Sequence, residues 1–419
     1  MSKKVAVQSQ DHAGSSRPSA LTATRALRTG DSVTQATEIH ASLGSVDKIE
    51  WNALFPGTAE SYDLYRAFEA VPGPGVSLGA LTLRDGARLI AAAPLFQTAY
   101  RLDTPFQGGL RKATDWVSAK APTLLQLNVL GLGSPQSDNF SLGLAGDLDP
   151  VGRRAKFGDL LTGLAAEGNA RKADILAIKS FAAEAEEFHF QLSEAGYTRV
   201  TSVPVVMLPL PYASLDHYLS SLPSKTGSYL KRKMRSAAGL RIEYRSSVAG
   251  LEDEINALLA ATLAQSSVDY GDLEQVHPQY IRRIMEQMGD KARLMLCWKD
   301  DALLSFQVFL IGETSIIANK IGMKYPEARE HNLYFVNWLK MIEFAIANNI
   351  PEIEMGATSY SAKLLFGGSI ERRWLYFRFR NGLVNRLAKP LAPFFDFERN
   401  DPELVRLAAA SATPATGAR

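Results

Sequence analysis

Residues 292–322 contain three apolar runs that are separated by only two short polar turns. The runs in "ARLMLCWKDDALLSFQVFLIGETSIIANKIG" are joined by Lys299-Asp300-Asp301 and by Gly312-Glu313-Thr314. Turns this short join antiparallel neighbours, because parallel strands need a long crossover. The first half of the chain carries a similar signal, since Asp85-Gly86 lies between the apolar runs of "SLGALTLRDGARLIAAAPLF". Each half is therefore predicted to contain an antiparallel meander.

Helical patterns surround both meanders. We expect helices at about 153–167, 182–195, 251–265, 278–288 and 332–348, and further strands at 173–181, 352–355 and 373–380. This order is typical of a mixed α/β fold of the α+β class, and 419 residues suffice for two domains. We expect a disordered tail at 1–33, domains at 34–205 and 206–398, and a flexible tail at 399–419.

Composition excludes several classes of protein. A net charge of +2 indicates no general preference for nucleic acid, so any basic site must be local. The single cysteine, Cys297, excludes an internal disulfide and lies in an apolar run, where we expect a buried, unreactive thiol. With scattered histidines as well, a zinc site is not expected. No segment approaches the roughly 20 apolar residues of a membrane span, and residues 1–33 lack the apolar core of an export signal. These features favour a cytoplasmic protein, or one peripheral to the inner membrane.

Three phrases, spread over roughly residues 40–385, resemble a known family. They are "LRDGARLIAAAPLF", "YLSSLPSKTGSYLKRKMRSAAGLRIEYR" and "YPEAREHNLYFVNWLKMIEFAIANNIPEIEMGATSYSAKLLFGG". Their order and spacing resemble the GCN5-related acyltransferase (GNAT) superfamily, and most of all its tandem Fem-like, peptidoglycan-type branch. The resemblance implies two GNAT-type domains that face a shared cleft. It also implies an amide-forming acyltransferase that uses acyl-CoA or an acyl carrier protein as co-substrate, with no bound cofactor.

One loop departs from the family pattern. A standard GNAT domain binds the coenzyme A pyrophosphate on a glycine-rich loop at a helix start. The corresponding "KYPEAREHN" contains no glycine, as is common in Fem-like proteins, so the resemblance leaves coenzyme A, a carrier protein and tRNA open as donor carriers. A basic cluster upstream offers a phosphate site, because Lys231, Arg232 and Arg235 lie within about two helical turns. The alternative is a solvated basic helix face.

The catalytic candidates follow from what the resemblance implies. Transfer to an amine needs a base that leaves the nitrogen neutral at attack. Asp269 and His277 lie in a polar loop between two predicted helices, and such a loop is also normal on any surface. Glu354 is a second candidate base, since it alternates with Ile353 and Met355 in a predicted strand.

The segment "EIEMGATSYSAKLLFGG" at 352–368 is the other candidate. In the GNAT layout this strand lies where the sheet opens for the acyl donor, and Gly356 permits a sharp turn. Ser359, Tyr360 and Ser361 would offer hydroxyl groups there, and Lys363 would meet a phosphate or a developing oxyanion. The alternative is a plain strand–helix connection with a solvated lysine.

The acceptor is the least constrained partner. Bacterial relatives within the resembling family N-acylate sphingoid bases to ceramide-type lipids, whereas others use aminoacyl-tRNA on cell-wall precursors. The basic and apolar stretch "RNGLVNRLAKPLAPFFDF" at 380–397 fits either a membrane interface or packing on the N-terminal domain. Together with the apolar turn around Phe366, it favours a lipid amine. A non-catalytic, polysaccharide-associated protein is the competing class, and DNA is not an expected partner.

Overall fold

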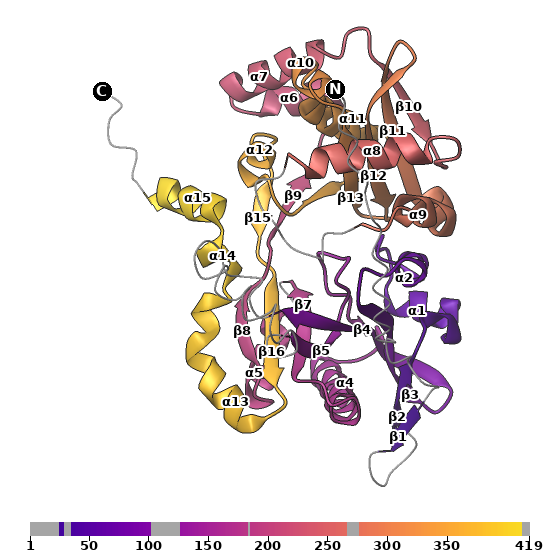
Figure 1. Cartoon of the computed structure of the whole chain (residues 1–419), viewed down its shortest axis with the longest axis vertical. Helices are drawn as coiled ribbons and strands as arrows, with labels where there is room; N and C mark the ends of the chain where they lie inside the picture. Colours follow the sequence, from indigo (N-terminus) through magenta and orange to yellow (C-terminus); the bar gives the residue numbers. More distant parts are fainter. Residues whose placement is uncertain (1–24, 29–34, 102–125, 183–184, 266–275, 413–419) are drawn as a thin grey trace, which may run out of the picture.

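The structure is a computed structural model that describes residues 25–28, 35–101, 126–182, 185–265 and 276–412. Two halves lie one above the other along the long axis, each built on its own sheet (Figure 1). The first sheet has the order β1-β2-β3-β4-β5-β7-β16-β8, and β6 pairs with β4. Its strands are β1 (Arg25–Arg28), β2 (Gln35–His40), β3 (Val76–Asp85), β4 (Arg88–Arg101), β5 (Gln126–Leu132), β6 (Gly143–Leu144), β7 (Ile175–Phe181), β8 (Thr198–Thr201) and β16 (Trp374–Phe379).

The second sheet has the order β10-β11-β12-β13-β14-β9-β15. Its strands are β10 (Arg241–Arg245), β11 (Ala292–Lys299), β12 (Ala302–Ile311), β13 (Ile316–Met323), β14 (Glu352–Gly356), β9 (Val205–Pro209) and β15 (Ser369–Glu371). Antiparallel pairing joins β11, β12 and β13, as the two short turns predicted. The β3–β4 hairpin also confirms its prediction, and its turn has Gly86 at φ 58°.

The two sheets exchange strands. β9 follows the first sheet along the chain, yet it pairs with β14 and β15 of the second sheet. β16 comes near the end of the chain, yet it lies between β7 and β8 of the first sheet. The sequence-based boundary at 205/206 therefore falls within β9, and no single cut along the chain separates the sheets. The exchange depends on pairing between strands that are far apart in the sequence, and the local pattern of residues does not predict such pairing.

Helices cover both sheets. In the first half they are α1 (Lys48–Leu54), α2 (Tyr62–Ala70), α4 (Pro150–Ala170) and α5 (Ala185–Glu194). In the second half they are α6 (Leu215–Ser221), α7 (Ser224–Arg235), α8 (Glu252–Leu263), α9 (Tyr280–Met288), α10 (Glu327–Glu330), α11 (Leu333–Ala347) and α12 (Tyr360–Leu364). The longest begins with Pro150 after the Asp149 cap, whose carboxylate accepts from Gly152 N. All five predicted helices are present with shifted ends. Among the described residues, every helix is too short or too polar to cross a bilayer.

Both ends of the chain differ from the expected tails. Within 1–33, the backbone of β1 pairs with β2 at the edge of the first sheet. Beyond β16, the chain forms α13 (Gly382–Ala388), a 3-10 helix η5 (Lys389–Phe394), α14 (Phe397–Asn400) and α15 (Pro402–Ala412). The last of these includes most of the expected flexible tail. Its Leu404 is buried, and its Glu403 accepts hydrogen bonds from α12. The Ala-rich composition of this segment does not predict these contacts.

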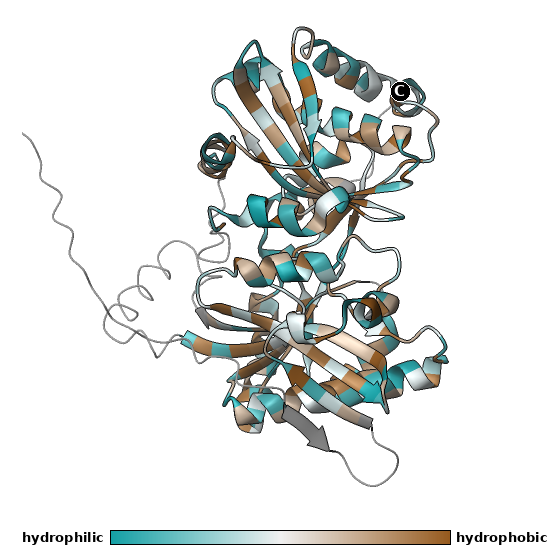
Figure 2. Cartoon of the chain, turned by 90° about the vertical axis from the view of Figure 1, so that its right-hand side faces the viewer, coloured by the Kyte–Doolittle hydropathy of each residue, from teal (hydrophilic) through white to brown (hydrophobic). Residues whose placement is uncertain are grey.

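The core continues across the junction between the halves. In Figure 2 the strands of both sheets are largely coloured as hydrophobic, while the helices carry both hydrophilic and hydrophobic residues. One cluster of buried residues contains members of both halves. At the junction the rings of Phe68 on α2 and Tyr280 on α9 stack with centroids 6.2 Å apart. The two halves are thus packed together, and the surfaces between them can share a site.

Candidate active site

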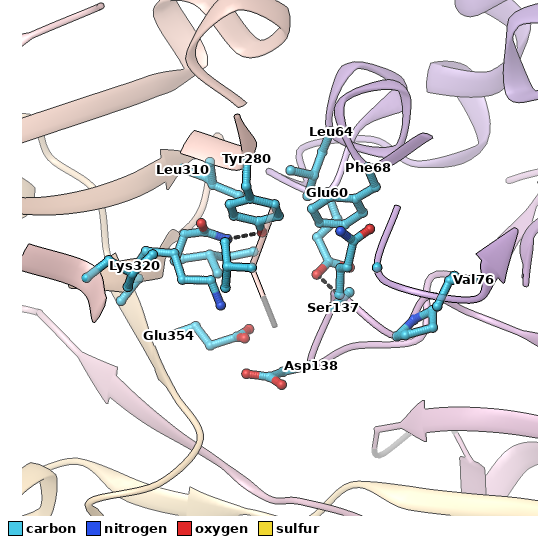
Figure 3. Close-up of a pocket in the computed structure, with 18 of the residues that line it drawn as sticks. Glu60, Leu64, Phe68, Val76, Ser137, Asp138, Tyr280, Leu310, Lys320 and Glu354 are labelled. Atoms are coloured by element: carbon cyan, nitrogen blue, oxygen red, sulfur yellow. Dashed lines mark hydrogen bonds between the residues drawn. The ribbon is translucent and has the colours of Figure 1, made fainter. Parts of the chain in front are cut away.

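A cavity of about 240 Å³ lies between the two halves, as Figure 3 shows. Carboxylates from three segments line it: Glu60 before α2, Asp138 in the loop after β5, and Glu354 on β14. Apolar side chains from both halves also line it: Leu64, Phe68, Val76, Leu259, Leu263, Val276, Leu310 and Ile317. Further polar groups of the lining are Gln136, Ser137, Tyr280, Asn319 and Lys320. The cavity therefore combines carboxylates with apolar side chains and other polar groups.

Glu354 lies where the second sheet opens. β13 and β14 run parallel but pair only at Ile316–Ile353 and Ile317–Glu354, after which the strands diverge. The Glu354 side chain is only 6% exposed. Burial, strengthened by the nearby negative charges of Glu60 and Asp138, raises its pKa to about 8. A carboxyl group with such a pKa can exchange a proton near neutral pH, which is the requirement for a general base.

A relay of hydrogen bonds holds the Glu354 carboxylate. Asn139 Nδ2 donates to its two oxygens at 3.0 and 2.8 Å. Arg373 Nε in turn donates to Asn139 Oδ1 at 3.0 Å. The buried Arg373 belongs to the connection from β15 to β16, where the chain crosses between sheets. The strand exchange thus orients the candidate base.

The loop that carries Asp138 is anchored by buried groups. The Glu60 carboxylate accepts hydrogen bonds from Ser137 Oγ and, at 3.0 Å, from Ser141 Oγ. Burial raises the pKa of Glu60 and lowers that of Lys179, which donates to the Ser137 carbonyl. Figure 3 shows Asp138 pointing into the space beside Glu354. Anchoring this loop keeps a second carboxylate facing the first.

β13 forms the wall beside Glu354, because Ile317 on β13 is the cross-strand partner of Glu354. Asn319 is the extra residue of a β-bulge. Val308 on β12 pairs with Lys320 and Phe309 pairs with Ala318, so Asn319 between them has no partner of its own on β12. Asn319 Nδ2 donates to the Tyr280 hydroxyl at 3.2 Å, and its Oδ1 is buried without a hydrogen-bond partner among the described residues. The Lys320 ammonium lies 5.5 Å from the Tyr280 ring. Figure 3 shows Lys320 and Glu354 on one side of the cavity, with Glu60 and Ser137 on the other.

The turn after β14 is held from within by Lys363. Its Nζ donates to the carbonyls of Gly356 at 2.9 Å and of Ala357 at 2.5 Å, and its burial lowers its pKa to about 7. Gly356 has φ 72°, as a sharp turn predicted, and Thr358 and Ser359 also have positive φ angles. Backbone conformations of this kind are concentrated at functional sites. Here the two hydrogen bonds from Lys363 hold the turn in place.

The neighbouring hydroxyl residues have different surroundings. Tyr360 is buried, and its hydroxyl donates to the Pro204 carbonyl at 3.2 Å. Ser359 and Ser361 are exposed. The Glu403 carboxylate accepts from the backbone nitrogens of Tyr360 and Ser361 at 3.2 and 2.7 Å. None of these three residues lines the cavity that contains Glu354.

Of the two loop candidates, only His277 can be placed relative to Glu354, and it does not line the cavity. Asp269 lies outside the described residues. His277 is exposed, and its Nδ1 accepts from Gln279 N at 3.1 Å, so it serves the start of α9. Its neighbours Val276 and Tyr280 line the cavity instead. Cys297 is buried as predicted, and burial raises the pKa of its thiol to about 11.

The basic cluster lies on α7, with Lys231, Arg232 and Arg235 exposed. Lys233 of the same helix lies between the Tyr229 and Phe335 rings, 5.0 and 5.2 Å from their centroids, and its Nζ donates to Asn332 Oδ1. Asn332 and Phe335 also line a second cavity of about 410 Å³. The remaining lining residues come from β13, α8, α10 and α11: Gln265, Met323, Tyr325, Ala328, Arg329 and Tyr334.

The second cavity is lined in part by the loop that the resemblance assigned to donor binding. The residues "KYPEAREHN" connect β13 to α11 and contain α10. The cavity therefore lies at the C-terminal end of β13, beside the start of α11, and Arg329 and Lys233 supply positive charge there. Among the described residues no group of three or more His, Cys, Asp or Glu side chains could hold a metal ion.

Sequence reasoning missed several site residues. Glu60, Asp138, Asn139 and Arg373 lie in segments that no motif marked, and Asn319 and Lys320 were seen only as part of a strand. The sole available signal was the Gly/Ser/Pro/Asn-rich composition at about 131–140, which indicates a loop but no partner for it.

Comparison with known proteins agrees with this geometry. Residues 224–364 match the family model of the acetyltransferase (GNAT) domain. None of the curated proteins gives a significant match. The solved structure of FemX aligns over 79% of this chain and 98% of its own, with 12% identity and a TM-score of 0.52. The C-terminal domain of a putative lysylphosphatidylglycerol synthetase from Agrobacterium fabrum aligns over 83% of this chain and 95% of its own, with 13% identity and a TM-score of 0.50.

The matched domain includes α7, the β11–β13 meander, α11, β14 and Glu354, so it contains both the opening of the sheet and the candidate base. GNAT acyltransferases form amides and use acyl-CoA as co-substrate, one of the two donors that the resemblance implied. Residues 224–364 are thus similar to a GNAT acetyltransferase domain, and the chain as a whole shares the fold of FemX.

Proposed function

We propose that this protein transfers an acyl group from acyl-CoA to the primary amine of a long-chain lipid, such as a sphingoid base, to give a ceramide-type amide. The observation that carries the proposal is the cavity between the halves, whose lining combines three carboxylates with large apolar side chains. Its carboxylates suit a cationic amine, and its apolar wall suits the hydrocarbon chain next to that amine. An amino acid or sugar acceptor would leave much of this apolar wall without a partner.

Glu354 acts as the general base. An amine arrives as an ammonium ion, and a positive charge beside Glu354 stabilises the ionised carboxylate and lowers its pKa. Glu354 then removes one proton, which leaves the nitrogen neutral with a free electron pair. Asp138 faces the same space and holds the positive charge while the acceptor is positioned (Figure 3). The raised pKa of Glu354 supports this role. Without an acceptor the carboxyl group is largely protonated at neutral pH, and the bound ammonium ion favours the ionised form that can act as a base.

The neutral nitrogen attacks the thioester carbonyl carbon directly. A C–N bond forms, the carbonyl electrons move to oxygen, and their return breaks the C–S bond. Coenzyme A leaves as the thiolate and takes up a proton, while the nitrogen loses its second proton. Asn319 and Lys320 line the cavity on β13, the strand next to that of Glu354, and are placed to donate to the developing oxyanion. Lys363 contributes by fixing the turn after β14.

The donor binds along the opening between β13 and β14, with its phosphates toward the second cavity and α7. Lys233 and Arg329 contact the residues of that cavity, and Lys231, Arg232 and Arg235 supply positive charge on the same helix. Ser359, Tyr360 and Ser361 shape the turn on the other side of the opening. This arrangement is supported by the short β13–β14 pairing, which ends at Ile317 and Glu354.

A second candidate is an aminoacyl-tRNA-dependent transfer to a cell-wall precursor. The exposed basic face of α7 favours it, because tRNA presents many phosphates to such a surface. The apolar wall of the first cavity favours the lipid amine instead.

The test is an assay of the purified full chain with either palmitoyl-CoA or aminoacyl-tRNA as donor and three acceptors: sphinganine, a short water-soluble amine and a cell-wall muropeptide. Released thiol and the amide product are measured, the latter by mass spectrometry. We expect amide formation with sphinganine and its loss in Glu354→Gln. Efficient acylation of the muropeptide from aminoacyl-tRNA, with no lipid amide, would replace the proposal by the second candidate. A matched control is Glu313→Gln, since Glu313 is an exposed carboxylate in the β12–β13 turn.

A further inference from the structure

The segment after β16 presents large apolar side chains to solvent. Leu383, Val384, Leu387, Leu391 and Phe394 of α13 and η5 are between 43% and 67% exposed. Other exposed apolar residues, such as Ile49, Val151 and Phe190, lie apart from one another on different helices. Scattered residues of this kind are normal, whereas five within twelve positions mark an interaction site.

These side chains are not used to attach the segment to the protein. Asn385 makes that contact for α13, because its Oδ1 accepts from Phe379 N and its Nδ2 donates to the Gly196 carbonyl, both at 2.9 Å. Ala392 and Phe395 do so for η5, and the Phe395 ring lies 5.9 Å from that of Phe377. One face therefore packs on the N-terminal half, as one of the two sequence interpretations predicted, and the larger apolar residues are left on the other.

Charge identifies the kind of partner. Arg386 and Lys389 are exposed among these apolar residues, and no acidic residue occurs from 381 to 395. A short helical element with apolar side chains and flanking basic groups suits the surface of an anionic bilayer, where the apolar side chains enter the acyl region and the cations meet lipid phosphates. We propose that the α13–η5 surface, made of Leu383, Val384, Leu387, Leu391, Phe394, Arg386 and Lys389, docks this protein on anionic phospholipid membranes.

The position of this surface is consistent with docking. α13 runs along the outer side of the lower half, away from the junction between the halves (Figure 1). Membrane contact there leaves the junction and its cavity uncovered. The inference goes beyond the proposed reaction, since it needs neither acceptor nor donor. It also accounts for how an enzyme without a membrane-spanning helix among its described residues would reach a lipid substrate.

The test is flotation of the full chain with vesicles of phosphatidylcholine alone or mixed with phosphatidylglycerol. We expect the protein to float with the mixed vesicles and to be released by salt. Leu387→Glu combined with Phe394→Glu should reduce the bound fraction about tenfold or more. Phe190→Glu, at an exposed phenylalanine on α5, is the matched control and should bind as the unchanged protein does.

Two further measurements separate this inference from its rivals. The double variant should retain acylation of sphinganine dispersed in detergent and its unfolding midpoint, which shows an intact fold and site. Undiminished vesicle binding by the double variant would overturn the proposal. So would a dimer in light scattering that the double variant dissociates, because the surface would then contact a second copy. Failure of the acylation assay with vesicle binding intact would reject the proposed function alone.

Discussion

Glu354→Gln is the most informative perturbation, because it keeps the size of the side chain and removes its charge. Burial raises the pKa of Glu354 to about 8, whereas the unfolded chain has the usual value of 4.5. The folded state therefore holds the proton more tightly than the unfolded state. Between these two pKa values the folded chain binds more protons at Glu354, so the contribution of this group to the stability of the protein falls as pH rises from about 5 to about 8.

The magnitude follows from the two pKa values. At about 1.4 kcal/mol per pH unit, the gap between 4.5 and about 8 amounts to about 5 kcal/mol of stability lost above pH 8, and about 3 kcal/mol lost by pH 7. The glutamine variant lacks this loss. It gives up one of the two hydrogen bonds from Asn139, a pH-independent cost of about 1 kcal/mol. The variant should therefore become progressively more stable than the unchanged protein as pH rises.

The assay is urea unfolding of both proteins from about pH 5 to about pH 9, with the free energy of unfolding compared at each pH. We expect the difference between them to change by about 1.4 kcal/mol per pH unit up to about pH 8 and then to level off. Turnover should fall by a factor of about 10² to 10⁴ with loss of the general base. Glu313→Gln should show neither effect. A pH-independent difference together with normal turnover would refute both the buried ionisation and the catalytic role.

Four other outcomes are expected. Lys363→Met leaves two carbonyls of its own turn unpaired, so urea unfolding should show a loss of about 2 kcal/mol, and turnover should fall about tenfold or more; normal turnover in a folded variant would remove Lys363 from the site. Asn139→Leu deletes the donors that lower the pKa of the candidate base, so the rising limb of kcat/KM against pH should move about one unit higher, and an unmoved limb would contradict the relay. Lys231→Ala with Arg232→Ala should raise KM for acyl-CoA and weaken its salt dependence, whereas an unchanged KM with weaker vesicle binding would assign these residues to lipid. Cys297→Ala should keep most activity with intersecting lines in two-substrate kinetics, and a trapped acyl-cysteine would overturn direct transfer.

Local chemistry made much of the fold predictable. The β3–β4 hairpin and the β11–β13 meander follow from short polar turns between apolar runs, and these signals act over a few residues. The same is true of Glu354, whose alternation with buried neighbours marked it as an inward-facing carboxyl group. The turn at Gly356 was also readable, because only a residue without a Cβ adopts its φ angle readily. For these features the sequence neighbours are also the structural neighbours.

Tertiary structure alone decided what surrounds Glu354. Asn139 lies 215 positions before Glu354, and Arg373 lies 234 positions after Asn139, yet the three form one hydrogen-bonded relay. Lys363 shows a different limit, since its partners are near in the sequence but the sequence left open whether its ammonium group meets a ligand or, as the structure has it, carbonyls of its own turn. The exchange of β9 and β16 creates the relay by carrying each half of the chain into the other sheet. Pairing between distant strands depends on the free energy of the whole packed structure, and a pattern of neighbouring residues does not contain it.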